Sequence, residues 1–443
     1  MGPEKTKARA IRPALVMAAL CLLSACMAGG GALDVTKMGF GAGKAPADPN
    51  APALSKQGDV TSPVISDLQS RRTVLPPGGP YAEIALAVTE AGAGVAAAEL
   101  RISRLRAEAK AKNWLPRIGP DASLTSLGAI AASILVEQTL FDNGRRKAER
   151  AYAAADVELA AVTLSSETNK RVYEGLKHYL SAERAREQAA VTERAVTRLA
   201  DYERIMTLRV DGGLSDRSEQ RVLSQKLAEM HATLSADRQA EATAMAELAA
   251  MTTRSLATLR GLQTLPPDPA GPEPLAVLRA RGEGARSVAE AQAAKADMLP
   301  GISANARLGK GGVDAGLGLS GGGFGFGNAA EREALDATAD LVGKRTAQAA
   351  EDANRRIVAL QSEIDTIVAR EAQGAEVLRQ TSGNLSMFTE QYKVGRRSLL
   401  ELVQQYEGFA RAERDQAALK YMAADLRLQI ALERGVLVDG ARM

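Results

Sequence analysis

The residue types that most often perform chemistry are scarce in this chain of 443 residues, which has only two histidines and two cysteines. His178 and His231 lie on different predicted helices, and neither has an acidic partner at the spacing of a metal-binding motif. No pair of carboxylates and no activated nucleophile stands at a catalytic spacing. We therefore expect no enzymatic activity, no bound metal and no cofactor.

Cys26 is the residue whose surroundings indicate a covalent modification. A basic segment that ends at Arg12 precedes the apolar run Ala14–Ala25, which has the length of a secretory signal and is too short to cross a bilayer. The sequence Leu23-Ser24-Ala25-Cys26 resembles the lipobox of bacterial lipoproteins. This resemblance implies a signal peptide over residues 1–25, a lipid on Cys26 and, because Met27 follows, sorting to the outer membrane. The alternative is a plain secretory signal that leaves Cys26 as a buried thiol.

Composition excludes several other classes of function. Hydrophobic residues make up 46% of the chain but aromatic residues only 3%, so the apolar content suits long, closely packed helices better than a thick core. Without the first 25 residues the chain has 52 basic and 52 acidic residues. A neutral chain with few aromatic rings lacks the basic surface and the stacking platform of a nucleic-acid-binding protein.

The chain divides at clusters of proline and glycine. Residues 26–80 are rich in Gly, Ala, Pro and Ser and predict a flexible tether. A first segment, 81–262, predicts a helix over 81–114, a β-hairpin over 116–141 and a long helical hairpin over 145–256 with its tip at 211–215. A Pro-rich linker, 263–274, leads to a second segment, 275–443, with a helix, a β-hairpin over 300–326 and a helical hairpin over 328–437 whose tip lies at 395–398.

The two segments repeat the same landmarks. Pro300 follows Pro116 by 184 residues, Gly327 follows Gly144 by 183, and Gly395 follows Gly212 by 183. We interpret the chain as an internal tandem duplication. The unbroken helix of about 66 residues in each segment would be roughly 100 Å long, which no single globular core requires.

Both hairpins have the length of membrane-spanning strand pairs. Each strand needs about 9–11 residues to cross a bilayer, and the two hairpin segments hold 26 and 27 residues. In the second hairpin Val313, Ala315, Leu317 and Leu319 alternate with polar or small residues, as in a barrel wall. The alternative is a soluble hairpin packed on the helices.

These landmarks in this order resemble the TolC-like outer membrane efflux protein family. The residues that carry the resemblance are Leu115-Pro116, Gln138 to Arg146, the turn Gly212 to Ser215, Leu299-Pro300, Phe324 to Gly327, and Tyr392 to Leu402. The resemblance implies a mainly α fold with a small β-barrel: a homotrimer in which each subunit gives four strands to a twelve-stranded outer membrane barrel, and a helical tunnel that extends into the periplasm.

The resemblance also implies roles for particular residues. A periplasmic gate would comprise Tyr392, Arg397, Glu401, Gln404, Asp211 and Ser218, although acids often stand in the family where Gln404 and Ser218 occur. The helix-tip turns would be made by Gly212, Gly213, Ser215, Gly395 and Ser398, with Ser215 and Ser398 as helix caps. The junction of barrel and tunnel would comprise Pro116, Phe141, Gly144, Pro300, Phe324 and Gly327.

The sequence therefore predicts a passive outer membrane exit duct for a tripartite efflux pump or a type I secretion system. Its partners would be two further copies of the chain, a periplasmic adaptor, outer membrane lipids and, indirectly, an inner membrane transporter, with no nucleic acid. The alternative is a lipoprotein that forms a coiled-coil scaffold of the cell envelope and has no channel.

Overall fold

The computed structural model describes residues 62–443 except 93, 125–129, 266–270, 310–311 and 321–327, all within one compact unit. The predicted signal peptide, Cys26 and most of the tether lie outside the described residues, as do Phe324 and Gly327. The helices of the described part are α2 (Pro63–Ser70), α3 (Pro80–Glu90), α4 (Val95–Ala111), α5 (Arg145–Asp211), α6 (Arg217–Ala250), α7 (Leu275–Asp297), α8 (Asn328–Lys393), α9 (Leu399–Glu433) and the short 3-10 helix η4 (Gly440–Arg442).

Four strands form one antiparallel sheet in the order β1-β2-β3-β4. They are β1 (Arg117–Leu124), β2 (Ile130–Phe141), β3 (Gly301–Gly309) and β4 (Gly312–Ser320). Both predicted hairpins are therefore present, and β2 pairs with β3 to join them into one sheet. β4 is described as far as Ser320, and residues 321–326, the end of the predicted second hairpin, lie outside the described residues.

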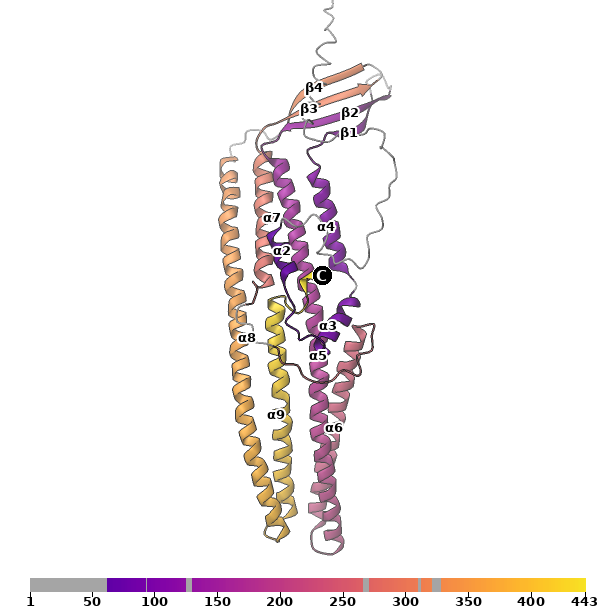
Figure 1. The fold of residues 1–443 in the computed structure, drawn as a ribbon, viewed down its shortest axis with the longest axis vertical. Helices are drawn as coiled ribbons and strands as arrows, with labels where there is room; N and C mark the ends of the chain where they lie inside the picture. The colour runs from indigo at the N-terminus through magenta and orange to yellow at the C-terminus, as the bar shows by residue number, and fades with distance from the viewer. Residues whose placement is uncertain (1–61, 93, 125–129, 266–270, 310–311, 321–327) are drawn as a thin grey trace, which may run out of the picture. The chain divides into compact units, whose positions relative to one another are not determined.

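The long helices connect the sheet to two distant turns. α5 has 67 residues and α8 has 66, so each is about 100 Å long. The sheet lies at one end of these helices, and the turns from α5 to α6 and from α8 to α9 lie at the other (Figure 1). None of the described helices has the length and hydropathy needed to cross a bilayer.

Contacts between helices define one layer. Near the sheet the neighbours run in the order α4, α5, α7 and α8, and towards the turns in the order α6, α5, α9 and α8. The same succession of elements occurs twice: β3 begins 184 residues after β1, α8 begins 183 after α5, and α9 begins 182 after α6.

The main core lies midway along α5, where short segments cover it. Tyr81 and Tyr179 are fully buried and meet edge to face with ring centroids 6.2 Å apart. Leu176 of α5 packs in the same cluster, together with the end of α9 and the C-terminal tail. This cluster fixes the middle of the helical layer.

The prediction that the tether extends to residue 80 was wrong for its last part. α2 buries Val64, Ile65 and Leu68, and the buried Arg71 that follows donates hydrogen bonds to the carbonyls of Arg434 and Glu273. Apolar residues at helical spacing pack on α5 despite the surrounding prolines. Residues 63–70 are thus a packed helix and not part of a flexible tether.

The single helix predicted over 81–114 is two helices. α3 ends at Glu90, and α4 begins after Gly94, which has φ +65°. Glycine adopts this left-handed conformation readily, and the helix is interrupted there. Trp114 and Leu115 lie in the turn that joins α4 to β1.

Candidate functional site

The register of the sheet divides its side chains into two faces, because residues directly opposite each other on paired strands share a face. Ile134 pairs with Leu308, which pairs with Val313, and Ala304 pairs with Leu317. This apolar face consists of Ile118, Pro120, Ile134, Val136, Gln138, Ile302, Ala304, Ala306, Leu308, Val313, Ala315, Leu317 and Leu319. Apart from Gln138, every member is nonpolar.

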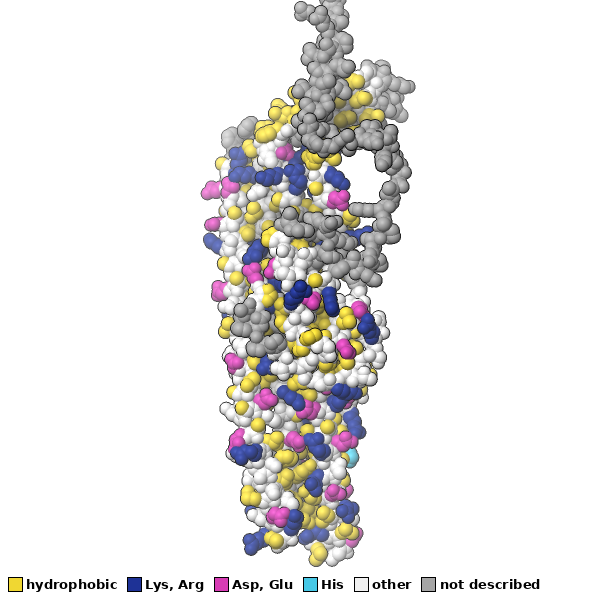
Figure 2. Space-filling view, viewed as in Figure 1, with side chains coloured by type: hydrophobic (Ala, Val, Ile, Leu, Met, Phe, Trp, Pro, Cys, Tyr) yellow, Lys and Arg dark blue, Asp and Glu magenta, His cyan; other side chains and the backbone are white. Residues whose placement is uncertain are grey.

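The apolar face is exposed in the single chain. Relative accessibility reaches 83% at Leu319, 76% at Leu317 and 71% at Ile118. Figure 2 shows hydrophobic side chains over the sheet. An exposed apolar surface of this extent on a regular sheet indicates contact with lipid or with another protein.

The opposite face is polar and charged. It carries Arg117, Asp121, Ser133, Glu137, Thr139, Ser303, Asn305, Arg307 and Asp314. The Arg307 Nε lies 3.4 Å from Oδ2 of Asp121, across β2. Leu135 is the one large apolar residue among the described side chains of this face. The sheet can therefore separate an apolar medium from water.

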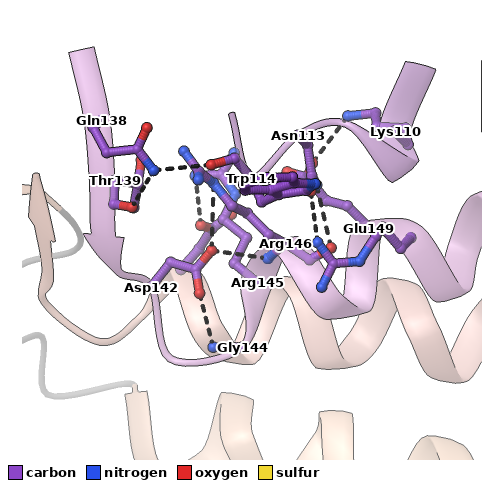
Figure 3. A network of polar contacts seen from close by, with 12 residues as sticks. Lys110, Asn113, Trp114, Gln138, Thr139, Asp142, Gly144, Arg145, Arg146 and Glu149 are labelled. Atoms are coloured by element: carbon purple, nitrogen blue, oxygen red, sulfur yellow. Dashed lines mark hydrogen bonds and ion pairs between the residues drawn. The ribbon is translucent and has the colours of Figure 1, made fainter. Parts of the chain in front are cut away.

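A polar network joins the sheet to the helices (Figure 3). Asp142 accepts hydrogen bonds from the backbone N–H groups of Gly144 and Arg146 and so starts α5. Asn143 donates to the carbonyl of Pro300 at 3.0 Å, which links the first hairpin to the second. Gly144, with φ +88°, and Pro300 therefore lie close together beside the sheet.

Glu149 is the centre of this network, and it was missed from the sequence. Its carboxylate accepts hydrogen bonds from Lys110 of α4 at 3.0 Å and from Arg145 at 3.2 Å, and Arg145 also pairs with Asp297 of α7 at 2.8 Å. Burial alone raises the pKa of Glu149, but the hydrogen bonds from Lys110, Asn113 and Arg145 outweigh it and hold the pKa below its ordinary value. The spacing of four residues from Arg145 to Glu149 is the sequence signal for this pair.

The other junction residues lie at the edge of the network. Phe141 ends β2 opposite Ile302 and is 55% exposed, and Pro116 directly precedes β1. A cleft of about 250 Å³ opens beneath the polar face of the sheet. It lies between the sheet on one side and the start of α5 and the end of α7 on the other. Arg117, Glu137, Arg146 and Asp297 line it.

The two helix tips have the same geometry. Gly213 has φ +71° and Gly395 has φ +75°. In each turn the N–H after this glycine donates to a carbonyl five residues earlier: Leu214 to Arg209 at 2.7 Å, and Arg396 to Gln391 at 2.9 Å. This is the Schellman arrangement, which requires a left-handed residue at its centre.

Two sequence predictions at the tips need correction. Gly212 has φ −82°, so Gly213 rather than Gly212 corresponds to Gly395, and the repeat offset there is 182 residues. Ser215 is not the cap of α6, because its hydroxyl accepts a hydrogen bond from Arg209; Asp216 caps α6 by accepting from Ser218 N–H at 3.0 Å. Ser398 does cap α9, in a reciprocal capping box with Glu401.

The predicted gate residues lie at or near these two helix tips. The Arg397 Nη1 is 3.2 Å from Oε1 of Glu401, and the guanidinium lies 4.9 Å from the centre of the Phe388 ring. The backbone N–H of Ser398 and the nearby Arg397 hold the pKa of Glu401 below its ordinary value. Gln404, Asp211 and Ser218 are exposed, and the side chains of Gln404 and Asp211 form no hydrogen bond or ion pair with any other described residue. Arg397 lies in the turn itself, and within one chain it binds both helices, because its Nε also donates to Oε1 of Gln391 on α8 at 3.1 Å.

An apolar cluster at the tips was not anticipated. Tyr202 and Met206 of α5 pack with Leu223 of α6 and with Leu399 and Leu402 of α9. Tyr392, a predicted gate residue, packs against this cluster through its ring rather than standing free. The cluster holds the two helical hairpins together near their turns.

Ion pairs between α6 and α9 add to this connection. Asp237 of α6 is 5% exposed; it pairs with Arg414 of α9 and accepts a hydrogen bond from Thr192 of α5 at 3.0 Å. Lys226 of α6 pairs with Glu407 of α9. These residues sit far from any motif, so sequence spacing alone does not identify them.

No other chemistry is evident among the described residues. They contain no group of three or more His, Cys, Asp or Glu residues that would hold a metal ion. The His178 Nδ1 instead lies 2.8 Å from Oε2 of Glu247, across α5 and α6.

Comparison with known proteins relates this architecture to channels. No protein family and no curated protein sequence matches the chain. Among solved structures, VceC of Vibrio cholerae, an outer membrane protein, is 14% identical, with a TM-score of 0.71 over 80% of this chain and 96% of that one. The CmeC outer membrane channel of Campylobacter jejuni is 12% identical, with a TM-score of 0.69 over 81% and 86%. The MtrE outer membrane channel of Neisseria gonorrhoeae, in its open state, is 15% identical, with a TM-score of 0.68 over 81% and 90%.

The chain has the fold of these outer membrane channels. The similarity extends over at least four fifths of each chain. Within this fold the described residues of the predicted sites lie at two places, the junction beneath the sheet and the two helix tips.

Proposed function

We propose that this protein is one subunit of a passive outer membrane export channel. The observation that carries the proposal is the sheet, whose apolar face is exposed while its opposite face is polar and charged. A sheet of this kind suits a wall between lipid and a water-filled lumen. The likeness to outer membrane channels supports the same function and localisation.

Closure of the wall requires further copies of the chain. β1 and β4 each pair with a single strand within the described residues, so the sheet has two open edges. Unpaired backbone groups are very costly in lipid, and membrane-spanning sheets close into barrels. Three copies would give twelve strands, and their long helices would form the tunnel that continues into the periplasm. The internal duplication accounts for the two hairpins and the two long helices of each subunit.

The helix tips would form the periplasmic gate. Tyr392, Arg397, Glu401, Gln404, Asp211 and Ser218 lie at the end of the layer farthest from the sheet. In a trimer Arg397 would stand near the axis and exchange its partner Glu401 for acids of a neighbouring subunit. The substrate would enter through this opening and leave through the barrel without chemistry, driven by an inner membrane transporter joined through a periplasmic adaptor in a tripartite efflux pump or a type I secretion system.

A lipid on Cys26 would attach the chain to the outer membrane. Residues 26–62 could span more than 100 Å when extended, which exceeds the distance along α5 from its contact with Ser62 to the sheet. The anchor and the sheet can therefore enter the same membrane. Radiolabelled palmitate incorporated by the intact chain and lost in Cys26→Ala tests this part of the proposal.

Assembly and conductance test the function itself. The purified protein should run as a heat-modifiable trimer from outer membrane fractions and give discrete conductance steps in a planar bilayer. A water-soluble monomer or dimer after removal of the lipid, with no conductance, would instead favour a coiled-coil scaffold of the envelope.

A further inference from the structure

The two flanks of the helical layer differ in partners and in charge. Near the sheet, α4 packs chiefly against α5, and α8 packs against α7. α4 and α8 therefore form opposite flanks of the layer α4-α5-α7-α8 (Figure 1). Each flank leaves large apolar side chains in solvent: Ile102 and Leu105 on α4 are 47% and 56% exposed, and Leu341 on α8 is 46% exposed.

The α4 flank is basic. Residues 95–112 contain five basic and two acidic side chains, a net charge of +3. Arg101 and Arg106 are exposed, and neither has an ion-pair partner among the described residues. Lys110 and Lys112 are also exposed, although they pair within the chain with Glu149 and Glu108.

The opposite flank, on α8, is acidic at the same distance from the sheet. Residues 328–343, the first part of α8, contain four acidic side chains and one basic side chain, a net charge of −3. Glu331, Glu333 and Asp340 are exposed and form no ion pair within the described part of the chain. Asp336 pairs with Lys295 of α7 at 2.6 Å.

The two charged segments lie at equal depth below the sheet. α4 ends five residues before β1, and α8 begins seven residues after the end of β4. The 17 residues of α4 cover about 26 Å and the first 16 residues of α8 about 24 Å. Farther from the sheet the charges are balanced: residues 353–393 of α8 hold five basic and five acidic residues.

We propose that α4 of one copy docks against residues 328–343 of α8 in a second copy, with the basic flank against the acidic flank. The proposal rests on the trimeric channel described above and specifies how its subunits recognise each other. Pairing α4 with α4, or α8 with α8, would bring like charges together, whereas the head-to-tail contact joins opposite charges and apolar residues on both sides. A head-to-tail contact that repeats around an axis closes a ring.

Cross-linking tests the contact directly. In the full chain, Leu105→Cys with Ala337→Cys places one thiol on each flank at a depth of roughly 15–20 Å below the sheet. Mild oxidation should convert the protein to covalent dimers and closed covalent trimers on denaturing gels. The matched control, Leu105→Cys with Val377→Cys, moves the second thiol about 60 Å along α8 and should give no such species. Equal cross-linking in both pairs, or none in the first, would overturn the proposal.

Charge reversal tests the electrostatic part. Two double variants reverse the charge of one flank each: Arg101→Glu with Arg106→Glu, and Glu333→Lys with Asp340→Lys. In each, the protein concentration at which half of the trimer dissociates should rise roughly tenfold, because several exposed ion pairs become like-charge pairs at once. The four changes combined should restore the trimer. Lys147→Glu, an exposed residue on α5 away from both flanks, is the control and should assemble normally.

The outcomes separate this interface from the proposed function. If the wild-type protein conducts as a trimer but the reversed variants assemble normally and the first cysteine pair fails to cross-link, the proposed contact between α4 and α8 is wrong. The proposed channel function is then unaffected. If the wild-type protein neither assembles nor conducts, the channel itself is wrong. Loss of the trimer in both double variants without rescue by their combination would also contradict the proposal.

Discussion

Leu317→Arg is the substitution that most sharply distinguishes a membrane-facing sheet from a soluble one. Leu317 is 76% exposed in the single chain and lies opposite Ala304 on the apolar face. It is five residues from Gly312 at the hairpin end, about 17 Å along the strand and roughly 12 Å in depth at a tilt of 45°. In an apolar band about 25 Å tall, this position is close to the midplane.

The expected cost follows from this depth. An arginine near the midplane on the lipid face of a barrel destabilises it by about 2–4 kcal/mol. This corresponds to roughly 30-fold to 900-fold in a folding equilibrium for each subunit. If the face were in water instead, an exposed substitution of this kind would change stability by about 0.5 kcal/mol or less.

Folding into phospholipid vesicles measures the difference. Urea titration of the refolded protein, followed by the heat-modifiable trimer on gels, should shift to much lower urea for Leu317→Arg. Asn305→Arg is the matched control, because Asn305 is in the same hairpin on the polar face opposite Gly316 and should fold almost as the wild type does. Equal behaviour of the two variants would refute the assignment of the apolar face to lipid.

The remaining predictions concern the helix tips, the junction and the N-terminal segment. Arg397→Glu should raise single-channel conductance and sensitivity to large antibiotics, because it removes the cation paired with Glu401 at the tip; unchanged conductance of an assembled trimer would count against the gate. Ser398→Ala should destabilise the start of α9 by about 1 kcal/mol through loss of the capping box, seen as faster amide exchange in its first turn, while Ser362→Ala, on an exposed part of α8, should not. The pKa values of Glu149 and Glu401 are lowered in the folded chain, so the ionised carboxylates stabilise the fold. This contribution is complete above the ordinary glutamate pKa and is lost as the pH falls through the lowered values. The melting temperature should therefore decline in that acidic range, and less so in Glu149→Gln. Arg71→Met should cost about 2 kcal/mol, because the carbonyls of Arg434 and Glu273 lose their buried donor, and a melting temperature equal to that of the wild type would refute this.

Patterns within a short stretch of sequence predicted much of the fold. The period of the helices, the proline and glycine breaks and the alternation of Val313 to Leu319 located the long helices and both hairpins. Ser398 was also predicted as the cap of α9, although its reciprocal partner Glu401 was not. At the other tip the motif misled, because Gly212 and Gly213 are adjacent and only backbone geometry shows which one is left-handed.

Contacts between distant segments were not predictable in this way. Glu149 joins α4 and α7 through Lys110 and Arg145, and Asp237 meets Arg414 from a position 177 residues away. α2 was hidden in a segment whose proline and glycine content suggested a tether, although Val64, Ile65 and Leu68 have helical spacing. Apart from Arg145 and Glu149, which are four residues apart, these polar residues gain their partners only when the helices lie side by side, so their spacing along the chain carries no signal.

Conductance of the purified protein in a planar lipid bilayer tests the central claim most directly. The account predicts discrete, long-lived steps from a trimer and larger steps from the Arg397→Glu trimer, since the proposed tunnel would be continuous and narrowest at its tips. A folded protein that contains the sheet but remains soluble after removal of the lipid, and that gives no conductance at any concentration, would contradict it.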